Sequence, residues 1–369
     1  MKGKVYLVGA GPGDYKLLTL KGLECIKKAD VIVYDRLANK NYLKEAKENC
    51  EFIYVGKASS NHTLPQDDIN RVIADKAKEG KIVTRLKGGD PYVFGRGGEE
   101  GELLKEEGIE FEVVPGITSA IGGLCYAGIP ITHRDYASSF HVITGHLRDD
   151  DKENPEINWN ALANTNGTLV FLMGVANLQK ISSNLIKEGK SKDTPVALIS
   201  WATRSNQRVI TSTLENVYET AVRENVKPPT LIAVGDVVEL RDKLNFFESK
   251  PLFGKNVIVT RSRTQSSSLV SKISDLGGNP IEVPTIKIEK IENNIQMFRL
   301  NEVYQYHKEE LRLVLKRRQM LSSRRYVEEV KKLVGEEDLD EILLGIPEKP
   351  ENLDKRILAK AKYDVVKRN

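Results

Sequence analysis

Short runs of β-branched and aliphatic residues recur along the first 245 residues, and apolar residues at helical spacing fill the stretches between them. The pattern predicts strands at residues 4–8, 31–34, 52–55, 82–86 and 111–114. Helical periodicity is clearest at 19–28 and 66–79. Because strands that alternate with helices are usually joined by crossover connections, we expect a parallel sheet covered on both faces.

A second series of strands follows a Pro115-Gly116 break. These strands are predicted at 140–144, 169–173, 196–201, 209–212 and 231–234. The simplest interpretation is an α/β fold of two lobes, residues 1–115 and 116–245. Folds of this kind bind ligands at the carboxyl ends of their strands, and a cleft between lobes is a frequent place for the ligand.

The pattern changes after residue 245. A linker and one strand–helix–strand unit (256–260, 265–276, 280–284) occupy residues 246–294. Residues 295–369 are dense in charge and nearly free of glycine, with leucines and valines at helical spacing, which predicts a charged helical tail.

Composition narrows the class of protein. The net charge is only +4, with 29% charged and 40% hydrophobic residues, so we expect no nucleic-acid partner. No apolar run approaches the eighteen or so residues that span a membrane, and the first residues lack a secretory signal. The three cysteines are too few for a disulfide framework, which favours a cytoplasmic protein.

A glycine-rich turn, GAGPGD at 9–14, follows the first predicted strand. Glycines there let the backbone approach a ligand closely. With Asp35 at the end of the next strand, a nicotinamide-dependent oxidoreductase is one alternative. Asp14 disfavours it, because a carboxylate at that position would repel a pyrophosphate.

The most informative stretch is RLKGGDPYVFGRGGEE at 85–100, which holds five glycines, two arginines, one lysine and three acids. A loop with this many glycines at the end of a strand indicates that its backbone is held against a ligand. Asp90 would accept hydrogen bonds from an amine or hydroxyls, and Arg96 would pair with a carboxylate.

Eight motifs in fixed order resemble the tetrapyrrole methylase family, and within it the uroporphyrinogen-III C-methyltransferases. They lie at 5–14, 33–37, 55–57 (with His62 and Gln66 following), 85–100, 114–120, 128–134, 142–146 and 172–174. The resemblance covers about residues 1–245. It implies a two-lobed homodimer that binds S-adenosylmethionine in the interlobe cleft and methylates uroporphyrinogen III at C2 and C7 to give precorrin-2, in sirohaem or cobalamin biosynthesis. A methylase of a later corrin precursor is the alternative within the family.

The resemblance also implies roles for single residues. The implied cofactor contacts are Pro12, Gly88, Gly89, Asp90, Val93, Thr118, Ser119, Met173 and Ala202. The last is a departure, because the family commonly has glycine there. Asp35 would be the proton acceptor and Lys57 the proton donor. Arg96, Glu99 and Arg134 would lie around the substrate.

The chemistry fits these residue types. A substrate with eight carboxylates needs arginines, the sulfonium already activates the methyl group, and C-methylation of a pyrrole releases a proton that a base can take. We expect no metal, since His133, His141 and His146 have no further ligand at a familiar spacing. Trp159 and Trp201 are interpreted as packing residues.

A second resemblance, over about 252–292, is to the opening of uroporphyrinogen-III synthase. The charged tail that follows does not resemble the rest of that enzyme. We therefore expect no synthase activity.

Overall fold

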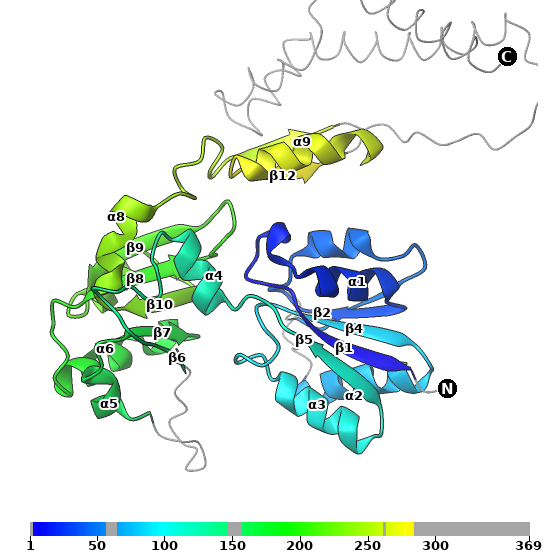
Figure 1. Ribbon diagram of the computed structural model, residues 1–369, viewed down its shortest axis with the longest axis horizontal. Helices are drawn as coiled ribbons and strands as arrows, with labels where there is room; N and C mark the ends of the chain where they lie inside the picture. The colour runs from blue at the N-terminus through cyan, green and yellow to red at the C-terminus, as the bar shows by residue number, and fades with distance from the viewer. Residues whose placement is uncertain (1–2, 57–64, 146–156, 261–262, 284–369) are drawn as a thin grey trace, which may run out of the picture. The chain divides into compact units, whose positions relative to one another are not determined.

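The computed structural model describes residues 3–56, 65–145, 157–260 and 263–283, with the backbone alone at 263–267 (Figure 1). Lys57, His62, His146 and the predicted tail lie outside these residues. Contacts group Met1–Val257 with Ser266–Ile281 into one compact unit, which contains both lobes. Among the described residues, the helices are all too short or too polar to cross a bilayer.

The first lobe is built on a five-stranded parallel sheet in the order β3-β2-β4-β1-β5. Its strands are β1 (Lys4–Gly9), β2 (Val31–Tyr34), β3 (Glu51–Tyr54), β4 (Ile82–Lys87) and β5 (Glu110–Val114). Its helices are η1 (Tyr15–Leu17), α1 (Leu20–Lys28), η2 (Lys40–Glu45), α2 (Gln66–Lys78) and α3 (Gly97–Glu106). The predicted parallel sheet is confirmed, with strand bounds within one or two residues.

Alternation along the strands sends side chains to two separate cores. Val5 and Leu7 of β1 pack with α2 and α3 on one face, while Val8 packs with α1 and η2 on the other. Helices therefore cover both faces of the sheet, as Figure 1 shows for α1 against α2 and α3. Buried on both sides, the sheet presents its polar loops only at the strand ends.

The second lobe also has five strands, in the order β6-β7-β10-β8-β9, but its sheet is mixed. Only β6 pairs with β7 in parallel. The strands are β6 (Phe140–Thr144), β7 (Thr168–Leu172), β8 (Pro195–Ser200), β9 (Arg208–Thr213) and β10 (Thr230–Val234). The β8–β9 connection is too short for a crossover, so these two strands must run antiparallel.

Helices cover this second sheet as well. They are α4 (Ser119–Tyr126), α5 (Trp159–Ala163), η3 (Val175–Asn177), α6 (Leu178–Lys187), α7 (Val217–Arg223), η4 (Asp236–Leu240) and α8 (Arg241–Leu244). Leu124 of α4 packs on one face, and Ile181 of α6 and Val217 of α7 pack on the other. The chain crosses from one lobe to the other at 115–118, between β5 and α4.

One expectation needs correction. The 85–100 stretch is not a single loop, because Arg85–Lys87 belong to β4 and α3 begins at Gly97. Only residues 88–96 are irregular. Gly97 permits this early helix start, since a Cβ there would lie 2.5 Å from the carbonyl oxygen of Pro91.

The second lobe continues past the predicted boundary at 245. Phe247 is buried against Tyr126, with ring centroids 4.7 Å apart, and Glu248 accepts from Gln207 and Arg241. The strand–helix–strand unit then follows as predicted, with β11 (Asn256–Val259), α9 (Arg263–Asp275) and β12 (Asn279–Glu282).

Candidate active site

Three glycines, Gly9, Gly89 and Gly116, bring the backbones of β1, the β4–α3 loop and the residues after β5 into contact. A Cβ on Gly116 would lie 2.4 Å from the carbonyl oxygen of Gly89 and 2.7 Å from Cα of Gly9. Gly11 and Gly89 also exchange two backbone hydrogen bonds, of 3.1 and 2.8 Å. Gly11 and Gly89 adopt φ of 70° and 73°, which glycine tolerates without a steric penalty. The result is a backbone cradle at the carboxyl ends of the parallel strands.

Asp90 fixes the far side of this cradle. One carboxylate oxygen accepts from the backbone N–H of Gly116 (2.9 Å), and the other accepts from Tyr92 (2.8 Å). Hydrogen bonds to an ionised acceptor are stronger than those between neutral groups. Asp90 therefore holds the interlobe crossing against the β4–α3 loop.

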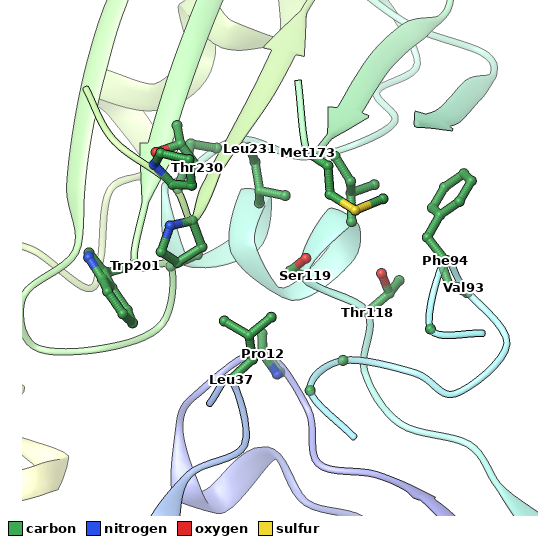
Figure 2. Close-up of a pocket in the computed structure, with 18 of the residues that line it drawn as sticks. Pro12, Leu37, Val93, Phe94, Thr118, Ser119, Met173, Trp201, Thr230 and Leu231 are labelled. Atoms are coloured by element: carbon green, nitrogen blue, oxygen red, sulfur yellow. The ribbon is translucent and has the colours of Figure 1, made fainter. Parts of the chain in front are cut away.

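A pocket of about 390 Å³ lies between the lobes (Figure 2), and Gly89 of the cradle is among the residues that line it. Pro12 and Leu37 of the first lobe face Met173, Trp201 and Leu231 of the second. The remaining lining residues are Gly11, Arg36, Gly88, Gly89, Val93, Phe94, Gly95, Thr118, Ser119, Leu172, Val175, Ala176, Ile199, Ala202, Arg204, Pro228, Pro229 and Thr230. The volume is at the small end of the range for ligand sites, and the mostly apolar lining with a few polar groups is typical of them.

Backbone strain is concentrated around the pocket. Six described residues other than glycine have positive φ, and Phe94, Met173 and Trp201 among them line the pocket, at 52°, 58° and 48°. Such conformations cost roughly 1–3 kcal/mol each and persist where the surrounding structure enforces them. Met173 is also 54% exposed, although it is a large apolar side chain. Both features mark a surface shaped for a ligand.

The structure brings together most of the residues predicted to contact the cofactor. Eight of the nine line the pocket: Pro12, Gly88, Gly89, Val93, Thr118, Ser119, Met173 and Ala202. Asp90 is the exception, because its carboxylate accepts hydrogen bonds from the backbone N–H groups of Tyr92 and Gly116. Ala202 is buried and its own φ is not positive, so its methyl group fits where the family commonly has glycine.

Asp14 ties the glycine-rich turn to the second lobe. Its carboxylate accepts from the Tyr126 hydroxyl at 2.8 Å, and its backbone N–H donates to the hydroxyl of Thr203 at 3.0 Å. Asp14 thus replaces the third glycine of a dinucleotide fingerprint with a contact between lobes. This arrangement disfavours the nicotinamide alternative.

Asp35 lies beside the pocket rather than in its lining. Oδ1 accepts from the backbone N–H groups of Leu37 (3.0 Å) and Ala38 (3.3 Å). Oδ2 lies 3.4 Å from Nη2 of Arg85. The side chain is 26% exposed, so the carboxylate is held firmly yet reaches solvent.

Arg85 belongs to a buried ionic cluster that the sequence did not reveal. Oε1 of Glu100 lies 3.2 Å from Nε of Arg85 and 2.6 Å from Nζ of Lys87, and all three residues are at most 4% exposed. Burial, and then the charge of Arg85, lower the pKa of Lys87. Oε2 of Glu100 is buried with no hydrogen-bond partner in the described part of the chain. A cluster so buried is costly to break, because each member offsets the desolvation of another.

The predicted substrate residues lie outside the pocket lining. Arg96 and Glu99 bind each other through two hydrogen bonds of 2.8 and 2.5 Å on the exposed start of α3. This pairing raises the pKa of Arg96 and lowers that of Glu99. Arg134 is exposed and makes no contact with them within salt-bridge distance.

Several pocket residues were missed in the sequence. Trp201, interpreted as a packing residue, lines the pocket, and so do Arg36, Phe94 and Arg204. Trp201 directly follows strand β8 and Arg204 lies three residues further on. Their position after the carboxyl end of a strand was the signal that could have found them. Among the described residues, no three or more His, Cys, Asp or Glu side chains gather as a metal site would require.

These features define a two-lobed α/β protein with a small-molecule pocket between its lobes. The chain belongs to the Tetrapyrrole (Corrin/Porphyrin) Methylases, whose family model matches residues 4–218. It is 51% identical over 248 residues to a uroporphyrinogen-III C-methyltransferase of Bacillus subtilis, covering 67% of this chain and 96% of that protein. It is 47% identical over 296 residues to the porphyrin biosynthesis protein HemD of Ruminiclostridium josui, covering 80% of this chain and 58% of that protein.

Among solved structures, the uroporphyrin-III C-methyl transferase of Thermus thermophilus in complex with S-adenyl homocysteine is similar to this chain. The TM-score is 0.55 and the identity 39%, over 64% of this chain and 94% of that one. The chain therefore spans nearly all of the shorter relatives but less than two thirds of HemD.

Proposed function

We propose that the chain methylates uroporphyrinogen III at C2 and C7 with S-adenosylmethionine, giving precorrin-2. The observation that carries this proposal is the pocket between the lobes, lined by eight of the residues expected to bind the cofactor, Gly89 of the cradle among them. The relatives with the same printed activity support it. We further propose that it acts as a cytoplasmic homodimer in sirohaem or cobalamin biosynthesis.

The pocket residues fit S-adenosylmethionine. A Cβ on Gly116 would clash with the backbone of Gly9 and Gly89, so the cradle requires glycine at this position. Glycine also lets a ligand approach the backbone closely. Pro12, Leu37 and Leu231 supply apolar walls for a flat ring, and Ser119 lies at the first turn of α4. When bound, the cofactor supplies an activated methyl group.

The chain's own contribution is then alignment and proton removal. The rigid cradle and the strained residues facing it hold the reactants in one geometry, which lowers the entropic part of the barrier. Asp35, fixed by two backbone N–H groups and Arg85, is the proposed acceptor of the proton that leaves the methylated carbon. Lys57 is proposed as the proton donor.

The test is mass spectrometry after anaerobic incubation with uroporphyrinogen III and S-adenosylmethionine, without added metal. We expect a product heavier by two methyl groups. Asp35→Asn should abolish most turnover while keeping S-adenosylhomocysteine binding, whereas Asp75→Asn, 69% exposed on α2, should leave both unchanged. Methylation of precorrin-2 instead of uroporphyrinogen III would favour the later corrin precursor.

A further inference from the structure

Charge in the pocket is unbalanced. Of the residues that line it, Arg36 and Arg204 are the charged ones, and both are cations. No aspartate, glutamate, lysine or histidine lies in this lining. The sequence-based candidates Arg96 and Arg134 are not part of it, so the pocket's positive charge has another source.

Both arginines lack a carboxylate partner within salt-bridge distance among the described residues. Two acids lie beside these arginines, because Asp35 precedes Arg36 and the backbone of Asp14 donates to Thr203, which precedes Arg204. Both acids are already engaged. Asp35 is bound by Arg85 and two backbone N–H groups, and Asp14 accepts from Tyr126 and from the backbone N–H of Lys16. Arg204 is partly buried, and a cation withdrawn from water without a carboxylate partner is unfavourable, so an anion that pairs with it would be bound favourably, while the exposed Arg36 remains open to the same anion.

Arg204 is preorganised at this place. Its Nη2 donates to the carbonyl oxygen of Leu37 at 2.8 Å, and its guanidinium lies 5.2 Å from the centre of the Trp201 ring. Burial lowers its pKa without changing its charge near neutrality. Because Leu37 follows Arg36 directly, these contacts hold the Arg204 guanidinium next to the segment that carries Arg36. This hydrogen bond uses one of the five guanidinium N–H donors, and the others have no hydrogen-bond partner among the described residues, so they can bind a carboxylate.

We propose that Arg36 and Arg204 form a carboxylate-binding subsite at the edge of the pocket, and that it takes an acidic side chain of the tetrapyrrole. This inference rests on the proposed function. A carboxylate could also come from the amino-acid end of the cofactor. The cofactor, however, carries a sulfonium and an ammonium as well, so its net charge is positive and two unpaired arginines suit it poorly. A substrate with several carboxylates matches the two positive charges of Arg36 and Arg204. A pocket of about 390 Å³ is too small to enclose a tetrapyrrole macrocycle, so the macrocycle would bind at the pocket's opening.

The experiment measures binding with the full chain and needs no turnover. Fluorescence titration with oxidised uroporphyrin III, which has eight carboxylates, is compared with coproporphyrin III, which has four. Arg36→Gln and Arg204→Gln should each raise the Kd for uroporphyrin about tenfold, as expected for losing a hydrogen-bonded ion pair. The effect on coproporphyrin should be smaller. Arg204→Lys should recover part of the loss, and Arg223→Gln, 69% exposed on α7, is the matched control.

Calorimetry separates the two sources of the carboxylate. S-adenosylhomocysteine and 5′-methylthioadenosine, which lacks the amino-acid end, should bind both variants as they bind the wild type. A selective loss of S-adenosylhomocysteine affinity, with uroporphyrin binding unchanged, would assign the arginines to the cofactor and overturn the proposal. An unchanged Kd for uroporphyrin in Arg36→Gln, an exposed residue whose replacement should not disturb folding, would overturn it as well.

The two proposals fail in different ways. A wild-type chain that binds uroporphyrin through these arginines but leaves uroporphyrinogen III unmethylated contradicts the proposed function and supports the subsite. A chain that methylates normally in both arginine variants, with the same KM for uroporphyrinogen III, contradicts the subsite alone.

Discussion

Nη2 of Arg85 lies 3.4 Å from Oδ2 of Asp35, and Nε of the same guanidinium lies 3.2 Å from Oε1 of the buried Glu100. The proposed proton acceptor is therefore attached to the buried core of the first lobe through one arginine. Neither partner of Arg85 is close to it in sequence.

This relationship predicts that Arg85→Met will slow methylation more than it weakens cofactor binding. Losing the guanidinium leaves Asp35 with its two backbone N–H partners and Glu100 with Lys87 and Gln66, which should destabilise the fold by about 3–5 kcal/mol. We expect kcat to fall about tenfold or more with an unchanged Kd for S-adenosylhomocysteine. Arg85→Lys, which keeps the charge, should recover part of the stability. A normal kcat in folded Arg85→Met would show that Asp35 needs no such support.

Gly116→Ala should disrupt the cradle, because its Cβ would lie 2.4 Å from a backbone oxygen that cannot easily move. Forced overpacking typically costs about 1–3 kcal/mol, and we expect S-adenosylhomocysteine affinity to fall at least about tenfold. The control is Gly98→Ala on α3, where no heavy atom lies within 4 Å of the added Cβ. It should leave binding intact and stabilise the helix by up to about 1 kcal/mol. Equal binding by both variants, measured by calorimetry, would contradict the proposed cradle.

Ala202→Gly should be nearly neutral for cofactor binding. The φ of Ala202 lies outside the left-handed region, although Trp201 and Thr203 on either side are at 48° and 67°. Its methyl group is buried, 3.0 Å from where a Cβ on Gly123 would lie. We expect a Kd for S-adenosylhomocysteine within about threefold of the wild type, and a clear loss for the larger Ala202→Val. A strong gain of affinity in the glycine variant would show that the methyl group obstructs the site.

Stability in acid should depend on Asp30. The backbone N–H of Ile82, and then the Lys47 ammonium, lower the pKa of this carboxyl below its ordinary value of 3.8. The unfolded chain therefore binds this proton at a higher pH than the folded one does. The stabilisation is complete above pH 3.8 and is lost as the pH falls through the lower folded pKa. Urea titrations of Asp30→Asn should show a stability deficit at neutral pH that shrinks below pH 3.8. A deficit of constant size would contradict this.

Two shortened chains test the boundary of the methylase region. A chain ending at Lys250 should fold and methylate, because it keeps Phe247 and Glu248, which pack on Tyr126 and Gln207. A chain ending at residue 245 loses both and should unfold at lower temperature.

The full chain should not cyclise hydroxymethylbilane to the type III isomer, since the synthase-like resemblance ends near residue 292. Detection of that product, or inactivity of the folded Lys250 chain, would contradict these expectations.

The local elements, and the residues that need a special backbone conformation, could be predicted from the amino-acid pattern. Strands such as β1 and β2 were predictable within a residue because a strand buried on both faces requires a nearly continuous apolar run. The glycines of the cradle were visible for a similar reason, since close backbone approach excludes a Cβ. Ordered motifs added the expected cofactor contacts, eight of which line one pocket.

The pairing of charged groups that are distant in the chain could not be predicted in this way. Nothing in the spacing of Asp35, Arg85 and Glu100 distinguishes a buried cluster from three solvated side chains, because ion pairing depends on which strands become neighbours. The antiparallel β8–β9 pair, which delivers Trp201 and Arg204 to the pocket, is likewise a property of the sheet. The local pattern predicts an element from its own burial. A site, in contrast, depends on contacts between residues far apart in the chain, and these form only when the strands of a sheet have paired and the elements have packed.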